Sequence, residues 1–343
     1  MGSRNRVPVG SRTVATRRRV LGMAAGMTTT LALARAGMAH QAATPTTGWS
    51  FTDDKGVTVE LDQRPERLLI DVNAAAPLWD FGIRPVGVFG WNASETGDFG
   101  DAGGNIDPTT VEVAGNASEP VQLEKMAAVD PDLIITVTWT PDNPNDYWSI
   151  EESLLPQVQD IAPIIAMSAT GRADVNTERF AELAAALGAD VDTPELAEAR
   201  ERYEAAKRDL ESTAAERSDL QVLFLYVDSE LLYIANPPDW ADLAFYQAAG
   251  VNIVVPDAEP GSFWEELSLE QALTYPADII MSSSRPGTVP PEEFATHPSF
   301  GAHPASQAGQ VVPWNQDFIM SYQGMAAAME HLTTTLNESE KVT

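Results

Sequence analysis

Two segments of the chain, one in each half, share a pattern that constrains the fold more than any other sequence feature. Residues 123–135 (LEKMAAVDPDLII) align without a gap with residues 269–281 (LEQALTYPADIIM), matching at a Leu-Glu pair, an Asp and an apolar run. Each segment predicts a short helix, a Pro-containing turn and a buried strand. The repeat therefore indicates two α/β units of similar construction.

A long helix is predicted between these two segments. Thr193 is suited to the N-cap and Pro194 to the first helical position. Residues 195–217 contain no Pro or Gly, and apolar residues recur at steps of three and four, at Leu196, Ala199, Tyr203, Ala206 and Leu210. At about 1.5 Å per residue this helix is roughly 35 Å long, enough to cross from one unit to the other. We therefore predict an N-terminal lobe at residues 49–192, a bridging helix at 193–218 and a C-terminal lobe at 219–343.

Short runs rich in Val and Ile alternate with helical patterns on both sides of the bridging helix. This order predicts an α/β fold of two Rossmann-like lobes, each with a central, mostly parallel sheet. A hairpin around Gly56 is expected within residues 51–61, and a closing helix at 321–336. The other expected helices are residues 74–81 and 123–128, and the other expected strands are residues 67–72, 85–89, 133–137, 161–166, 222–227, 231–235, 252–255, 278–282 and 310–312.

The first 40 residues have the composition of an export signal. They contain seven Arg but no Lys, Asp or Glu, and Arg17-Arg18-Arg19 precedes an Ala-rich apolar stretch that ends near Ala34. That stretch is shorter than the roughly 20 residues of a membrane-spanning helix, so a twin-arginine signal at residues 1–40 is the better interpretation. Residues 41–48 are expected to be a disordered lead-in. The signal predicts a periplasmic or extracellular protein, and because the chain has no Cys we expect that it is not a Cys-linked lipoprotein.

Composition and missing motifs exclude several classes of function. A formal net charge of −29 opposes binding to nucleic acid, and the lack of Cys excludes disulfides, thiolate zinc sites and a cysteine nucleophile. The sequence has no Gly-x-Ser-x-Gly, phosphate-loop or His-Glu-x-x-His motif. We therefore expect no catalytic residues, no resident metal and no cofactor. An exported enzyme without a recognisable motif and an adhesive module remain as alternatives.

Two further groups of polar residues have weaker interpretations. His297 and His303 each precede a Pro and have no clear third partner for a metal. The acidic stretch at residues 98–107 does not have the spacing of a helix-loop-helix calcium site. Both are expected to be surface loops.

Candidate ligand-binding residues come after the predicted strands. Ligands of open α/β sheets bind outside the carboxyl ends of the strands, and Trp139 and Arg285 stand at equivalent positions after the two repeated segments. A cleft between the lobes could close on a ligand there. The further aromatic candidates are Trp91, Tyr226, Tyr233, Trp240 and Trp314, and for each of them burial in the core is the competing interpretation.

The sequence resembles the class III solute-binding proteins of ABC importers, which capture ferric siderophores or cobalamin. The resemblance spans roughly residues 49–336 and is carried by residues 51–59, 65–69, 82–88 and the repeated segment at 123–135. It implies two α/β lobes bridged by a long helix, a binding role, and an ABC permease with its ATPase as partners of a monomer. It also implies that Glu124 and Glu270 dock into the permease.

The resemblance leaves the ligand open. Strong negative charge disfavours an anionic catecholate or citrate complex, so a small-molecule metal chelate of the ferric hydroxamate type is the first expectation. Cobalamin and haem are the alternatives within the same fold.

Overall fold

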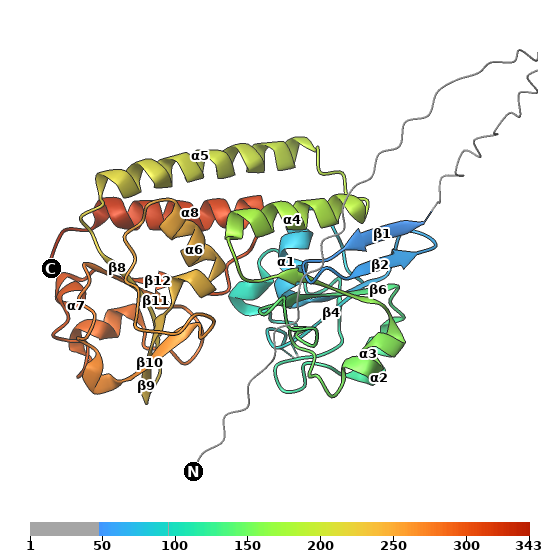
Figure 1. Ribbon diagram of the computed structural model, residues 1–343, viewed down its shortest axis with the longest axis horizontal. Coiled ribbons are helices and arrows are strands. Elements are labelled where there is room, and N and C mark those ends of the chain that lie inside the picture. Colours follow the sequence, from blue (N-terminus) through green and yellow to red (C-terminus); the bar gives the residue numbers. More distant parts are fainter. Residues whose placement is uncertain (1–47, 95) are drawn as a thin grey trace, which may run out of the picture. The chain divides into compact units, whose positions relative to one another are not determined.

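Two five-stranded sheets organise residues 48–94 and 96–343, the part of the chain that the computed structural model describes (Figure 1). The predicted export signal and all but the last residue of the predicted lead-in lie outside this part. We call the first sheet with its helices the first lobe and the second sheet with its helices the second lobe. The fold is α/β with two lobes, as predicted.

The sheet of the first lobe is parallel throughout, with the strand order β5-β4-β3-β6-β7. Its strands are β3 (Leu68–Asp71), β4 (Gly87–Phe89), β5 (Glu112–Val113), β6 (Leu133–Thr138) and β7 (Ile164–Ser168). Its helices are α1 (Val72–Asp80), η1 (Gly100–Gly103), α2 (Leu123–Val129), α3 (Leu155–Ile161) and α4 (Ala173–Ala186). The residues of β3 and β6 are all buried, as expected for central parallel strands covered on both faces.

The sheet of the second lobe is mixed, with the order β10-β9-β8-β11-β12. Its β8, β11 and β12 run parallel, whereas β9 is antiparallel to both β8 and β10. The strands are β8 (Val222–Val227), β9 (Leu231–Ala235), β10 (Trp264–Ser268), β11 (Ile279–Ser283) and β12 (Val311–Trp314). The helices are η2 (Pro237–Asp239), α6 (Ala241–Ala248), η3 (Leu269–Gln271), η4 (Pro291–Thr296) and α7 (Pro304–Ala308).

One predicted strand is wrong, and two observed strands, β5 and β10, were not predicted. Residues 252–255 make only an isolated bridge between Ile253 and Val222, because β9 occupies that edge of β8 from Leu225 onwards. Both missed strands lie at the edge of their sheets, β5 in the first lobe and β10 in the second. The repeated segment also differs between lobes, since it begins with the α-helix α2 in one and with the short 3₁₀-helix η3 in the other.

The repeated Asp has the same structural role in both lobes. Asp132 precedes β6 and accepts hydrogen bonds from the backbone N–H groups of Glu66 and Arg67, just before β3, at 2.9 Å. Asp278 precedes β11 and accepts one from Gln221 N, just before β8, at 2.8 Å. Each carboxylate therefore holds the starts of two adjacent central strands together.

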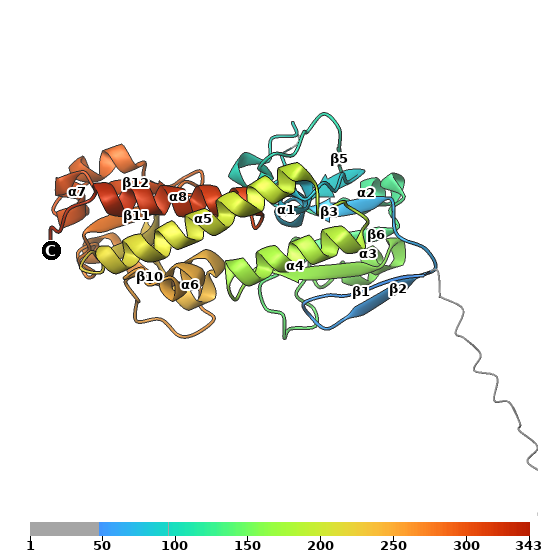
Figure 2. The same cartoon turned by 90° about the horizontal axis from the view of Figure 1, so that it is seen from above.

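The predicted bridging helix is α5 (Pro194–Glu216), and α8 (Tyr322–Glu338) lies alongside it (Figure 2). Thr193 caps α5 by accepting a hydrogen bond from Leu196 N at 3.2 Å. The predicted apolar stripe of α5 is buried, and the rings of Tyr203 and Tyr322 lie 5.5 Å apart. Arg202 forms a bidentate ion pair with Glu330 on the outer side. None of the helices described is long and apolar enough to cross a membrane.

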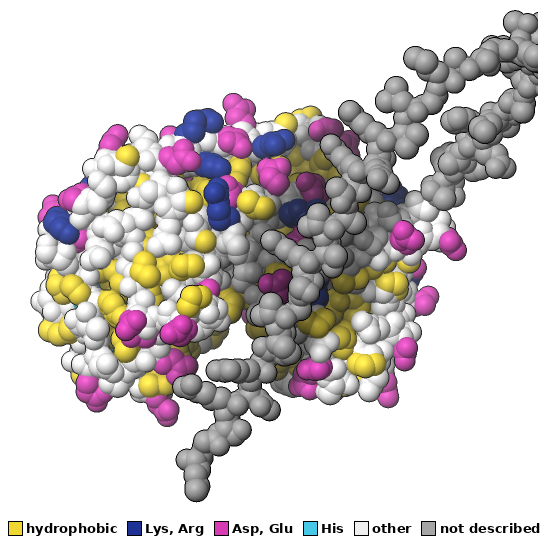
Figure 3. Space-filling view, in the orientation of Figure 1, with side chains coloured by type: hydrophobic (Ala, Val, Ile, Leu, Met, Phe, Trp, Pro, Cys, Tyr) yellow, Lys and Arg dark blue, Asp and Glu magenta, His cyan; other side chains and the backbone are white. Residues whose placement is uncertain are grey.

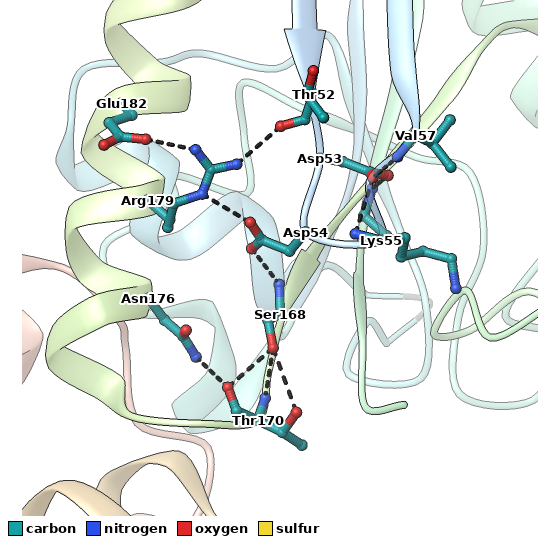
Figure 4. A network of polar contacts seen from close by, with 11 residues as sticks. Thr52, Asp53, Asp54, Lys55, Val57, Ser168, Thr170, Asn176, Arg179 and Glu182 are labelled. Atoms are coloured by element: carbon teal, nitrogen blue, oxygen red, sulfur yellow. Dashed lines mark hydrogen bonds and ion pairs between the residues drawn. The ribbon is translucent and has the colours of Figure 1, made fainter. Parts of the chain in front are cut away.

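The N-terminal hairpin of β1 (Trp49–Thr52) and β2 (Thr58–Leu61) is tied to the first lobe by a polar network (Figure 4). Arg179 on α4 donates to Asp54 at 2.8 Å and to the carbonyl of Thr52 at 2.9 Å. The other oxygen of Asp54 accepts from Ser168 N at the end of β7, at 2.8 Å. The hairpin turn therefore binds the end of the outermost strand of the sheet.

Candidate ligand-binding site

A pocket of about 470 Å³ lies between the lobes, beyond the carboxyl ends of β4 and β11. We call it the cleft pocket. The first lobe lines it mainly with residues 91–94 and 98–102, and the second lobe with residues 284–286 and 317. Its position agrees with the rule that ligands bind at the carboxyl edge of open α/β sheets. Trp91 and Arg285, both predicted site residues, face this pocket from opposite lobes.

Trp91 is held at the pocket by a buried carboxyl group. Its side chain is 45% exposed, and its backbone N–H lies 3.3 Å from Ser149 Oγ, which in turn donates to Asp71 at 2.6 Å. Burial raises the pKa of Asp71 to about 6, against the opposing effect of its hydrogen bonds from Ser149 and Asn73. Gly90 has φ 113°, and a Cβ there would lie 2.2 Å from the Asp71 carboxylate. Only glycine fits between this carboxylate and the Trp91 loop.

The cleft pocket carries more negative than positive side chains. Among the described residues, its only basic side chain is Arg285, which makes a bidentate ion pair with Asp317, with Nε 2.8 Å from Oδ2 and Nη2 bonded to Oδ1. Asp98 and Asp101 also line the pocket. Ser284 Oγ donates to Asp101 at 2.8 Å, which connects the two lobes across the pocket.

A second, aromatic pocket of about 280 Å³ adjoins the cleft pocket. Arg285 and Pro286 line both cavities. Tyr226, Tyr233 and Trp264 form the aromatic wall, with ring centroids 5.7 Å apart for the two tyrosines and 6.2 Å apart for Tyr233 and Trp264. The structure thus places the predicted Tyr226 and Tyr233 beside Arg285.

Two of the predicted site residues, Trp240 and Trp314, are buried and line neither the cleft pocket nor the aromatic pocket. Trp240 is 4% exposed and donates from Nε1 to the carbonyl of Phe263 at 2.9 Å. Trp314 is 3% exposed and donates to the buried carboxyl of Asp242 at 2.8 Å. Each packs with three or more aromatic rings, and burial of the indole explains why sequence position alone did not separate them from site residues.

Trp139 is half-buried between the lobes. Its backbone N–H donates to Asp146 at 2.8 Å, and its ring lies 5.7 Å from Trp240 and 5.5 Å from Phe263. It lines a small cavity of about 30 Å³ with Asp317 and Met320. The side chain therefore contributes to the contact between lobes rather than to the wall of the cleft pocket.

The two glutamates assigned to docking are exposed at equivalent positions of the lobes. Glu124 stands in the first turn of α2 and Glu270 in the first turn of η3. In the view of Figure 3 several Lys and Arg side chains gather over α5 and α8, whereas acidic side chains are spread more widely. Within the described residues, no group of three or more His, Asp or Glu side chains is placed to hold a metal ion.

Some residues of these pockets were not predicted. Asp98 and Asp101 were assigned to a surface loop, whereas η1 and its flanks bring them to the cleft pocket. Asp317 and Trp264 belong to no sequence motif. Asp317 reaches the site from the loop after β12, and Trp264 from the unpredicted strand β10. The one sequence feature that could have indicated Asp317 is its position shortly after the predicted strand at residues 310–312.

Comparison with known proteins identifies the class of protein that this fold and cleft define. A family model described as periplasmic binding protein matches residues 86–318, so the chain belongs to the periplasmic binding protein family. It is a solute-binding protein of two lobes and a bridging helix, and not an enzyme.

Individual relatives make the likeness more specific. The structure of DesE, a ferric-siderophore receptor protein from Streptomyces coelicolor, superposes with a TM-score of 0.80 at 31% identity, over 86% of this chain and 100% of that one. The Fe(3+)-citrate-binding protein YfmC of Bacillus subtilis is 25% identical over 80% of this chain and 81% of its own length. The catecholate-siderophore binding protein VctP of Vibrio cholerae, at 17% identity and a TM-score of 0.59 over 84% of this chain and 99% of that one, shares the fold.

Proposed function

We propose that this chain is the extracytoplasmic substrate-binding component of an ABC importer and that it captures a ferric siderophore of the hydroxamate type. The ligand lies in the cleft pocket, between Trp91 of the first lobe and Arg285 of the second, and reaches the aromatic wall of Tyr226 and Tyr233. The iron is cargo, held by the chelator and not by protein side chains.

The charge of the cleft pocket supports this choice of ligand most directly. Arg285, the one cation among the described residues of the pocket, is already paired with Asp317, and Asp98 and Asp101 add two further carboxylates. An anionic ferric catecholate or ferric citrate would enter against these charges, whereas a neutral or cationic ferric hydroxamate would not. The half-buried aromatic rings suit a bulky, partly apolar chelate.

The relatives support the same class of ligand. DesE is described as a ferric-siderophore receptor and shares 31% of its residues over nearly the whole chain. YfmC is described as binding ferric citrate, but it is more distant. The acidic cleft is the reason for preferring the hydroxamate over the citrate complex here.

Delivery to the membrane is part of the proposal. We assign Glu124 and Glu270 to the contact with a permease that is driven by its ATPase, and we expect the binding protein to act as a monomer. The Arg17-Arg18-Arg19 signal would send the chain out by the twin-arginine route.

The test is a titration of the protein's tryptophan fluorescence with ferrioxamine, a ferric catecholate, ferric citrate, haem and cobalamin. We expect saturable quenching by ferrioxamine, and an affinity about tenfold lower for Arg285→Ala because the chelate loses a charged hydrogen-bond donor. Arg208→Ala, on the exposed face of α5, is the matched control and should bind as the unaltered protein does. Preferential binding of citrate or catecholate would overturn the hydroxamate assignment, and no binding of any chelate would overturn the proposed function.

A further inference from the structure

A second large cavity, of about 500 Å³, adjoins the cleft pocket along α8. We call it the α8 groove. Its lining includes the buried residues Tyr246, Trp314 and Leu332. Phe318 and Ile319 also line it, next to the small residues Gly324, Ala327 and Ala328 of α8.

The groove is apolar in a strongly acidic protein. The chain carries 50 Asp and Glu against 21 Lys and Arg, yet Asp101 is the one Asp or Glu that lines the groove within the described residues, and no Lys or Arg does. His331 also lines the groove, and its Nε2 lies within hydrogen-bond distance, 2.9 Å, of the carbonyl oxygen of Pro313. A cavity of this size and polarity is suited to a flexible hydrocarbon chain.

The groove and the cleft pocket meet at a defined boundary. Asp101 and Ser284 line both cavities, and the hydrogen bond of 2.8 Å between them joins the lobes at this boundary. A molecule bound in the cleft pocket can therefore extend into the groove without leaving the protein surface. This continuity distinguishes the groove from an isolated apolar patch.

We propose that the α8 groove binds an apolar arm of the captured chelate, and that the protein therefore prefers siderophores carrying an acyl chain. The proposal rests on the proposed function, because it places the chelate itself in the cleft pocket. Each methylene group buried in the groove should raise the affinity about fourfold. Burial of only two methylene groups would then raise it by more than tenfold.

The experiment compares two neutral ligands that differ only in chain length. Ferrioxamine B is acylated on its terminal amine with either an acetyl or an octanoyl group, and both chelates are titrated against the protein. We expect the octanoyl chelate to bind at least about tenfold more tightly. Ala328→Phe, which fills the groove, should abolish this preference and leave the affinity for the acetyl chelate unchanged.

Control variants separate the outcomes. Ala197→Phe adds the same side chain to the exposed face of α5 and should keep the preference. Ala327→Phe, at the exposed rim of the groove, replaces Ala328→Phe if that variant does not fold. Equal affinity for the two chelates, or a preference that survives in the groove variant, would overturn the inference while the proposed function stands. If neither chelate binds, the hydroxamate assignment of the proposed function fails, and the inference fails with it.

Discussion

The two lobes share a frame but differ in the connection that leaves their first central strand. In the first lobe, β3 leads into α1, which crosses over so that β4 runs parallel to β3. In the second lobe, β8 turns at once into β9 through a tight turn in which Asp228 accepts from Glu230 N and Leu231 N. The hairpin places Tyr226 opposite Tyr233, whereas in the first lobe the Trp91 loop follows β4. The repeated Asp thus preserves the sheet, and the divergent connections give each lobe a different wall for a ligand.

The largest expected effect comes from removing the shared Asp, and it should differ between the lobes. Asp278 is fully buried, pairs with Lys341 at 2.8 Å and also accepts from the backbone N–H groups of Val342 and Thr343. Asp278→Ala should reduce the free energy of unfolding by about 3 kcal/mol, because the backbone N–H groups of Gln221, Val342 and Thr343 lose their acceptor. Asp132→Ala, which removes an exposed carboxylate with two backbone donors, should cost about 1 kcal/mol. Urea denaturation measures both, and equal losses would contradict this difference between the lobes.

A second difference concerns the buried carboxyl groups next to the site. In the first lobe both oxygens of Asp71 have hydrogen-bond partners. In the second lobe Asp242 has Trp314 on one oxygen and, within the described residues, no partner on the other, and burial raises its pKa to about 7. The folded protein therefore favours the neutral form of Asp242 at pH values below this pKa of about 7.

Asp242→Asn should reveal this as a pH dependence of stability. Because the folded-state pKa is raised, the stability contributed by Asp242 is complete below about pH 4 and is lost as the pH rises through about 7. The Asn variant lacks this titration, so it should gain on the unaltered protein by at most about 4 kcal/mol between pH 4 and pH 8. Thermal or urea unfolding across that range measures the difference. A difference that does not change with pH would show that Asp242 does not titrate there.

The bridging helix and the central strands of both sheets were predictable because local sequence patterns specify them. The apolar stripe of Leu196, Tyr203 and Leu210 identifies the bridging helix, and the repeated segments identify β6 and β11. The edge strand β10 was not predictable in the same way, since Glu265 and Glu266 interrupt its apolar pattern. It becomes a strand because its backbone pairs with β9 in the folded sheet, and its own sequence pattern does not specify that pairing.

The site was only partly predictable, for a related reason. The strand-end rule located Trp91 and Arg285, because it depends on topology and not on packing. It also selected Trp240 and Trp314, which the aromatic core buries through contacts distant in sequence. Arg285 alone predicts a positively charged pocket, but its ion pair with Asp317 offsets that charge. No local pattern in the sequence indicates this pairing.

The smallest expected effect tests whether the first lobe's wall serves binding and not stability. Trp91 is 45% exposed, so Trp91→Ala should leave the free energy of unfolding nearly unchanged and weaken the binding of ferrioxamine about tenfold. Trp79→Ala is the control, because Trp79 packs against Arg84 at 4.1 Å and lines neither the cleft pocket nor the aromatic pocket. It should bind normally even if it is less stable. If Trp91→Ala binds as tightly as the unaltered protein, Trp91 does not contact the ligand. Arg285 and the tyrosines of the second lobe would then hold the ligand without a contribution from the first lobe's wall.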